Sequence, residues 1–273
     1  MYRPALIEDY AIIGDCHTAG LVARNGSIDW LCFPRFDSPA CFAALLGSEE
    51  NGHWLIAPAG AIQQIRRRYR DGTLILETEF TTAEGTVALV DCMPPRSAEP
   101  DVVRLVVGRH GQVRMRMQLI VRFDYGSIVP WVRRTDIGIR AIAGPDTLIL
   151  QSGVDLRNEN FTTSAEFIVS AGETVPFVLA WHRSHEAAPA AVDAEQTVAQ
   201  TEKWWRKWSG RCIYQGPWRE AVVRSLITLK ALTYAPTGGI VAAPTTSLPE
   251  QLGGVRNWDY RYCWVRDATF TLY

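Results

Sequence analysis

The chain alternates apolar and polar residues in many short runs between residue 10 and about residue 184. Leu76 and Thr78, for example, alternate with Glu77 and Glu79, which is the two-residue period of a strand with one buried face. Further strands are predicted at TDIGIRAI, DTLILQS, FTTSAEFIVS and TVPFVLAWH. Turn dipeptides separate several runs: Asn25-Gly26, Asp71-Gly72, Glu84-Gly85 and, near the middle, His110-Gly111. Many short antiparallel strands at this spacing predict a sandwich of two sheets.

One segment of this β-rich part is predicted to be helical. SPACFAALLG at 38–47 offers Ser38 as a helix cap and Pro39 at the first helical position. After residue 184 the apolar period lengthens to three and four residues, which indicates helices. One stripe ends at Gly210 and consists of Ala191, Ala194, Val198, Thr201, Trp205 and Trp208. We expect it to form a linker helix.

A second helix is predicted to begin at Pro217 and to end near Pro236 and Gly238. Its expected apolar face is Trp218, Val222, Leu226 and Leu229. More than twenty residues without a regular pattern follow, and loops of that length are usually functional. The predicted organisation is a β-sandwich domain at 1–184, a linker helix at 185–215 and the beginning of a helical domain at 216–273. About sixty residues cannot close a helical domain, so we expect this last part to be incomplete.

Composition and charge narrow the class of protein. Hydrophobic residues make up 47% of the chain and charged residues 21%, as in globular proteins. A net charge of −1 offers no field for nucleic acid or an anionic membrane, and no apolar run approaches the ~20 residues of a membrane span. No secretion signal is visible. The six cysteines form no C-x-x-C pair, which indicates buried, reduced thiols and a cytoplasmic location.

The closing stretch RNWDYRYCWVRDATFTLY at 256–273 is the densest in aromatic and charged side chains. It resembles family 15 glycoside hydrolases, the bacterial glucoamylase- and trehalase-like enzymes. So do SLITLKALTYAPTGGIVAAPTTSLPE before it and IEDYAIIGDCHTAGLVARNGSIDWLCFPRFDSPACFAALLG near the N-terminus. The resemblance covers the whole chain. It implies a mainly β fold: a large antiparallel β-sandwich domain, then a linker helix and the incomplete start of an (α/α)6 barrel.

The same resemblance implies the N-terminal part of an inverting α-glucoside hydrolase that releases glucose from an α-linked di- or oligosaccharide. We expect no cofactor and no metal site in these residues, and a phosphate or metal requirement of the complete enzyme is not visible in this sequence. In this family both catalytic carboxyl groups are glutamates on later barrel loops, so residues 1–273 would hold no catalytic residue and would be inactive alone. Arg266 and Asp267 would hydrogen-bond the terminal glucose, and Trp264 and Tyr260 would line its pocket. Glucoamylase and trehalase are not separated by this sequence.

Each of these residues has a structural alternative. Asp267 could cap the helix that follows it, and Trp264 and Tyr260 could be core aromatics. For the whole chain, one alternative is a disaccharide phosphorylase of the same architecture, and another is a non-catalytic β-sandwich that binds carbohydrate or serves as a structural partner.

Other conspicuous side chains are interpreted mainly as structural. Asp15 and His17 are expected to form a buried pair, and Asp29 to belong to a hairpin, whereas Arg35 and Asp37 are left open between loop structure and the pocket mouth. The pair His182 and His185 lacks a third metal ligand nearby. The run RRRYR at 66–70 is expected to be a solvated face or an ion-pair surface, and the tryptophans at 204, 205 and 208 a packing seam.

Overall fold

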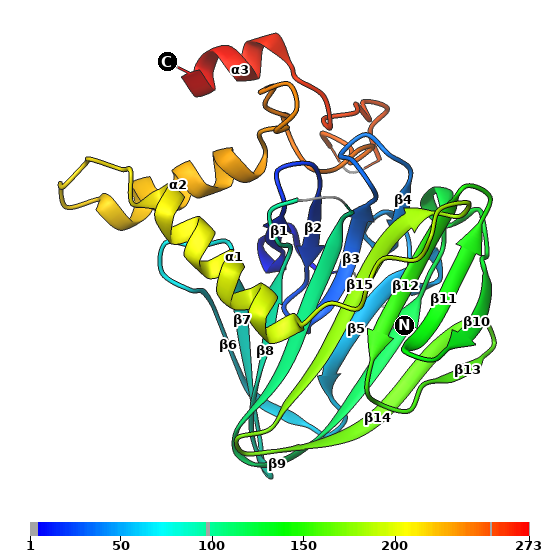
Figure 1. Cartoon of the computed structure of the whole chain (residues 1–273). Helices are drawn as coiled ribbons and strands as arrows, with labels where there is room; N and C mark the ends of the chain where they lie inside the picture. The colour runs from blue at the N-terminus through cyan, green and yellow to red at the C-terminus, as the bar shows by residue number, and fades with distance from the viewer. Residues whose placement is uncertain (1–4, 97–98, 252, 273) are drawn as a thin grey trace.

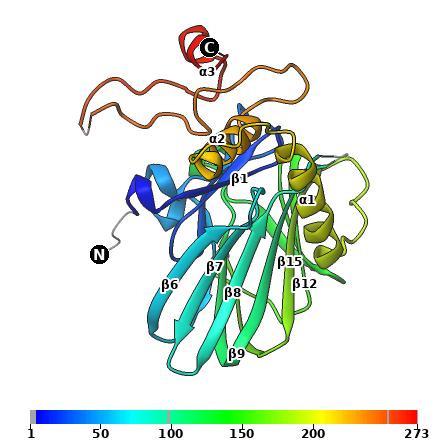
Figure 2. The ribbon, with the colours of Figure 1, turned by 90° about the vertical axis from the view of Figure 1, so that its left-hand side faces the viewer.

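The computed structural model describes residues 5–96, 99–251 and 253–272, so Tyr273 of the closing stretch lies outside it. Two layers of antiparallel strands form a sandwich, and helical segments cover one face and one end of it (Figures 1 and 2). The predicted sandwich of two sheets is therefore confirmed.

The first layer holds the N-terminal strands and the hairpin that follows residue 156. Its hydrogen-bonded order is β1-β2-β3-β5-β9-β14-β13, with β4 paired to β3. The bounds are β1 Ala11–Gly14, β2 Ala19–Val22, β3 Ser27–Cys32, β4 Ala40–Phe42, β5 His53–Pro58, β9 Asp101–Ile120, β13 Arg157–Glu159 and β14 Thr162–Ser170.

The second layer has the order β6-β7-β8-β9-β15-β12-β11-β10. Its further strands are β6 Ile62–Tyr69, β7 Leu76–Thr82, β8 Gly85–Cys92, β10 Trp131–Thr135, β11 Gly138–Ala143, β12 Asp146–Ser152 and β15 Thr174–Arg183. Four 3-10 turns lie between strands: η1 Ile7–Asp9, η2 Ala44–Leu46, η3 Glu49–Asn51 and η4 Asp124–Gly126.

Strand β9 belongs to both layers. Its first part, to Gly111, pairs with β8 and β15, and its second part, from Gln112, pairs with β14 and β5. Gly111 has φ +64° at the crossing, and a Cβ there would come within 2.2 Å of the Glu84 carbonyl oxygen. The predicted turn at His110-Gly111 is wrong, because the residues after Gly111 find new strand partners and the strand bends instead of reversing.

The core lies between the layers, where inward side chains such as Ile28, Trp54 and Phe80 are fully buried. A buried ion pair also lies there: Arg104 Nε donates to Asp91 at 2.8 Å, and both side chains are inaccessible. Arg104 also donates to the carbonyls of Trp54 (2.7 Å) and Gly26 (2.6 Å) in the other layer. Arg104 therefore fastens the two layers together.

The predicted turns at Asn25-Gly26, Asp71-Gly72 and Glu84-Gly85 are confirmed, since at each of them the chain reverses from one strand to its antiparallel partner. The predicted helix at 38–47 is wrong. Ala40–Phe42 forms β4, with Phe42 opposite Leu31 of β3, and only the 3-10 turn η2 follows. Residues 40–44 are all buried, so the segment has no polar face to distinguish a helix from an edge strand.

Helix α1 (Ala194–Ser209) packs on the outer face of the second layer (Figure 2). It starts later than the predicted stripe, because Asp193 caps it by accepting a hydrogen bond from the Gln196 N–H at 3.0 Å. Trp205 is 1% exposed and belongs to one buried cluster with Leu74 of the sandwich side and Ile227 of the next helix. The predicted tryptophan seam is thus confirmed.

Helix α2 (Arg219–Ala231) crosses the end of the sandwich, and α3 (Val265–Leu272) follows after a long loop (Figure 1). The expected apolar face of α2 is not the one that packs: Ile227 and Ala231 are fully buried, whereas Trp218 is 71% exposed. Apolar residues occupy several sides of this helix, so periodicity alone did not identify the packed side. Among the described residues, no helix is long and apolar enough to cross a membrane.

Candidate substrate-binding site

The loop between α2 and α3 folds into two facing arms, at residues 242–250 and 256–262. Backbone hydrogen bonds join them: the Ala242 N–H to the Tyr262 carbonyl (3.1 Å), the Ala243 N–H to the Tyr260 carbonyl (2.9 Å) and the Ser247 N–H to the Trp258 carbonyl (3.2 Å). The predicted long irregular loop is confirmed, because no helix or strand lies between α2 and α3 in the described residues. Its two arms nevertheless give the closing stretch a fixed backbone path.

Tyr260 and Trp264 lie together in this stretch. Their rings stack with centroids 5.4 Å apart and an angle of 26° between the planes. The Trp264 indole N–H donates to the Asp259 carbonyl at 3.1 Å, which fixes the ring relative to the backbone. Both side chains are half-buried, so neither is a core aromatic in the described structure. Stacked, partly open rings of this kind can pack against the C–H face of a sugar.

Arg266 and Asp267 lie in the first turn of α3. Arg266 Nη2 is 3.2 Å from Asp267 Oδ2, and the side chains are 68% and 40% exposed. The Arg266 guanidinium also lies 5.8 Å from the centre of the Trp264 ring. The four residues expected from the sequence therefore form one continuous chain of contacts. Asp267 is inside the helix rather than at the cap position before it, since α3 begins at Val265.

Asp259 and Arg261 form a second charged pair, which is joined to this group by the hydrogen bond from Trp264 to the Asp259 carbonyl. Arg261 donates to both carboxylate oxygens of Asp259, at 3.0 and 2.8 Å. Burial alone would raise the pKa of Asp259, but the hydrogen bonds from Arg261 outweigh it and hold this pKa below its ordinary value. Burial would likewise lower the pKa of Arg261, and the contacts with Asp259 raise it instead. Both groups therefore stay ionised across the physiological range.

Sequence reasoning gave no role to Asp259 and Arg261. The local signal was present, because an Asp and an Arg two residues apart stand inside the most aromatic stretch of the chain. The partners of Arg261 from the first 130 residues, Ser38 and Tyr125, could not be identified from the sequence, because they are far from it along the chain.

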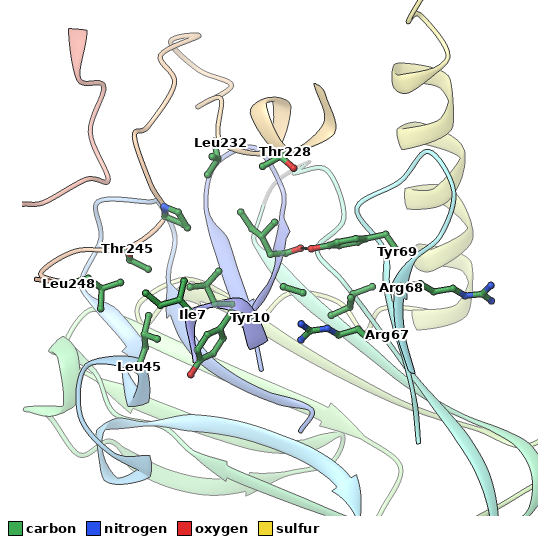
Figure 3. A pocket seen from close by; sticks show the side chains of 15 residues that line it. Ile7, Tyr10, Leu45, Arg67, Arg68, Tyr69, Thr228, Leu232, Thr245 and Leu248 are labelled. Atoms are coloured by element: carbon green, nitrogen blue, oxygen red, sulfur yellow. Dashed lines mark hydrogen bonds between the residues drawn. The ribbon is translucent and has the colours of Figure 1, made fainter. Parts of the chain in front are cut away.

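A separate cavity of about 470 Å³ lies between η1, β1, β6, α2 and the loop at 244–248 (Figure 3). Its walls are mostly apolar, with Ile7, Leu45 and Leu248 among the lining residues, and Tyr69 donates its hydroxyl to the Ile12 carbonyl at 2.8 Å. None of the four expected substrate residues lines it. A sugar needs many hydrogen-bonding groups, so the candidate site remains with the closing stretch.

The other conspicuous residues are structural. Asp15 is buried but pairs with Arg96 at 2.5 Å and with the backbone N–H groups of His17 and Thr18, not with the imidazole of His17 as expected. That imidazole instead meets Tyr234 edge to face, with centroids 5.5 Å apart.

Asp29 is buried and accepts hydrogen bonds from Tyr10 (2.8 Å) and Ser27 (2.5 Å), which confirms its structural interpretation. Arg35 and Asp37 form an ion pair at 2.9 Å with side chains 53% and 30% exposed, and both of their interpretations stay open.

Two of the arginines at 66–70 form ion pairs, whereas Arg67 donates to the backbone carbonyls of Asp9 and Val22. Arg68 and Arg70 pair with Glu77, and Arg70 also pairs with Glu202 of α1 at 2.8 Å. In the described parts of the chain, no group of three or more His, Cys, Asp or Glu side chains could hold a metal ion.

Comparison with known proteins agrees with this fold and these motifs. The trehalase-like N-terminal family matches residues 2–205, and glycosyl hydrolases family 15 matches residues 216–273. A trehalase of Mycolicibacterium smegmatis is 36% identical over 295 aligned positions, which cover 98% of this chain and 44% of that protein. A trehalase of Mycobacterium tuberculosis is also 36% identical, over 98% of this chain and 43% of that protein. The chain thus spans less than half the length of the relatives it matches.

A solved structure gives the same picture of the fold. A bacterial glucoamylase complexed with acarbose superposes with a TM-score of 0.65 at 12% sequence identity, over 97% of this chain and 46% of that chain. The architecture is therefore mainly β, with an antiparallel sandwich followed by a helix and the start of an (α/α)6 barrel. On the match over residues 2–205, this chain belongs to the trehalase-like N-terminal family, and that match is continued by the match of residues 216–273 to glycosyl hydrolases family 15.

Proposed function

We propose that this chain is the N-terminal part of an α-glucoside hydrolase that releases glucose, and that trehalose is its substrate. The observation that carries the proposal is the contact chain of Tyr260, Trp264, Arg266 and Asp267 in the closing stretch. The choice of trehalose over maltose is supported by the relatives, which are called trehalases and align with 92% or more of this chain.

The four residues suit recognition of a terminal glucose. The stacked pair Tyr260 and Trp264 offers an aromatic surface beside two charged groups. The Asp267 carboxylate can accept hydrogen bonds from two adjacent hydroxyls, and Arg266 can donate through its fork. Together they would fix the orientation of the sugar, so that its scissile oxygen meets a catalytic acid.

The bond cleavage itself is proposed to use two glutamates beyond residue 273, as the family resemblance implies. One would protonate the leaving oxygen, and the other would activate water on the opposite face of the sugar, which inverts the anomeric carbon. Residues 1–273 are therefore expected to have no hydrolytic activity of their own.

We also propose the three-part division at 1–184, 185–215 and 216–273. It is supported by the last strand ending at Arg183, by α1 on the outer face of the sandwich, and by α2 beyond it. The sandwich would then serve as a scaffold for the barrel. A cytoplasmic location is supported by the six free thiols, four of which are buried.

The experiment is to express the full-length protein and to measure glucose release from trehalose and from maltose. We expect release from trehalose with inversion, so that proton NMR of the first turnovers shows one α- and one β-glucose per trehalose. Production of glucose 1-phosphate that depends on added phosphate would show a phosphorylase instead. Release of glucose from maltose alone would assign the glucoamylase activity, and no product from either sugar would contradict the proposed hydrolysis.

A further inference from the structure

Arg261 is a buried cation that joins two distant parts of the chain. The residue is only 6% exposed, although it lies in the loop that carries the candidate site. Its Nη1 donates to the Ser38 carbonyl at 2.7 Å and contacts the Cys32 Sγ at 3.6 Å, both on the sandwich side. Its guanidinium lies 5.6 Å from the centre of the Tyr125 ring, from turn η4 of the sandwich.

The opposite edge of the same guanidinium donates hydrogen bonds to the Asp259 carboxylate. Nε and Nη2 each donate to one carboxylate oxygen, so four of the five donor hydrogens of an arginine have acceptors here. A planar fork is needed to reach a carboxylate on one side and a carbonyl on the other. A lysine ammonium at this position could not satisfy both sets of partners.

The other arm of the loop is fastened at the same corner of the sandwich. The Trp30 indole N–H donates to the Pro244 carbonyl at 2.7 Å, and the Trp30 ring lies 6.3 Å from the ring of Tyr125. Trp30 thus contacts the first arm of the loop, and Tyr125 contacts the second arm through Arg261. Because the arms are also bonded to each other, the sandwich defines where the whole loop lies.

Arg261 is adjacent to the candidate substrate residues. Tyr260 precedes it, and the indole of Trp264 is bonded to the carbonyl of Asp259, the carboxylate partner of Arg261. A shift of Arg261 would therefore move the stacked rings, and small displacements of positioning groups can lower turnover by about a hundredfold.

We propose that Arg261 is a positioning residue that fastens the substrate-binding stretch to the β-sandwich and thereby orients Tyr260 and Trp264. Its effect on turnover rests on the proposed function, whereas its contact with the sandwich does not. The sandwich then takes part in setting the geometry of the site, through Ser38, Cys32 and Tyr125.

The test uses the full-length protein and the variants Arg261→Lys and Asp259→Asn. The second leaves Arg261 in place and keeps one acceptor oxygen, but it removes the charge and replaces the other oxygen with an NH2 group that cannot accept from Arg261. Arg134→Lys is the matched control: Arg134 also donates to a carboxylate (Asp155, 3.4 Å) and to a carbonyl (Leu156), but both partners belong to the sandwich. We expect kcat on trehalose to fall about tenfold or more in the two site variants, with KM changing less, and no change in Arg134→Lys.

A second readout does not depend on activity. Cys32 is 1% exposed and burial raises the pKa of its thiol to about 12, so iodoacetamide should alkylate it very slowly in the unaltered protein. Peptide mapping by mass spectrometry follows this residue separately from the exposed Cys263. We expect Cys32 to react faster in Arg261→Lys and Asp259→Asn, and at the original rate in Arg134→Lys.

The outcomes separate the inference from the proposed function. Normal kcat in both site variants would overturn the positioning role. Lost turnover with Cys32 still protected would also overturn it, because Arg261 would then act without holding the loop on the sandwich. If the unaltered protein releases glucose from neither sugar, the proposed function fails. In that case faster alkylation of Cys32 in the two site variants would still support the contact of Arg261 with the sandwich. Unchanged alkylation of Cys32 would overturn that contact.

Discussion

Replacement of Asp267 by alanine in the full-length protein separates two roles of this carboxylate. In the first role it accepts hydrogen bonds from glucose hydroxyls, and in the second it only stabilises the first turn of α3. The structure bears on both, because Asp267 lies in that first turn, is 40% exposed at its side chain and pairs with Arg266 at 3.2 Å.

The two roles predict different magnitudes. A hydrogen bond to a charged group contributes about 1.5–3 kcal/mol, so the loss of two should raise the transition-state barrier by about 3 kcal/mol or more. That corresponds to a fall in kcat/KM of roughly a hundredfold or more. As a structural group, an exposed carboxylate in a first helical turn contributes less than about 1 kcal/mol to stability.

The assay is kcat/KM on trehalose together with the midpoint of thermal unfolding. Asp193→Ala is the matched control, since Asp193 caps α1 by accepting the Gln196 N–H at 3.0 Å and lies outside the candidate site. We expect the control to lose about 1 kcal/mol of stability and no activity. A folded Asp267→Ala protein with near-normal kcat/KM would refute the substrate contact and leave only the helical role.

Three further predictions concern stability of the same full-length protein. Burial raises the pKa of Asp101 to about 6, above the value of ~4 in the unfolded chain. The folded state therefore binds the carboxyl proton of Asp101 more tightly than the unfolded state, and the free energy of unfolding should fall as the pH rises from about 4 to 6. Asp101→Asn should accordingly raise the free energy of unfolding in urea at pH 7, by on the order of 2 kcal/mol, and not at pH 4; an equal effect at both pH values would contradict the assignment. Asp91→Ala should cost about 3–5 kcal/mol in urea unfolding, because it leaves Arg104 charged and unpaired in the core; a loss below about 1 kcal/mol would show that water or another group compensates. Trp205→Ala should cost about 3–5 kcal/mol, as it empties the contact between α1, α2 and Leu74, and an unchanged urea midpoint would argue against that contact.

The strands and turns were predictable where local chemistry decides them. Gly26 and Gly72 adopt positive φ in the turns that their sequences indicate. The alternation in β7 is matched only in part: Leu76 is buried as expected, but Glu77 is buried as well, where it pairs with arginines. The failures at 38–47 and at Gly111 have different causes. The segment at 38–47 pairs with the neighbouring strand β3 and is buried on all sides at 40–44, so its residues show no period that separates a strand from a helix. Strand β9 continues past Gly111 because it pairs with β14 and β5, and a local pattern contains no information about such distant partners.

The contacts of the candidate site also divide into those between residues close in sequence and those between distant residues. Tyr260, Trp264, Arg266 and Asp267 are close in sequence, so their association follows from the loop and the first turn of α3. Their roles as substrate contacts remain predictions. The partners of Arg261 could not be derived, because Ser38 and Tyr125 precede it by more than a hundred residues and reach it only through the tertiary fold.

The crossing of β9 from one layer to the other has a consequence for how the sandwich opens. Hydrogen bonds from this one strand hold β8 and β15 in one layer and β5 and β14 in the other. Removing either layer would strip one half of β9 of its neighbours and expose the core beneath. We therefore expect the amides of β9 to be among the slowest to exchange with deuterium, and both layers to unfold in a single cooperative step.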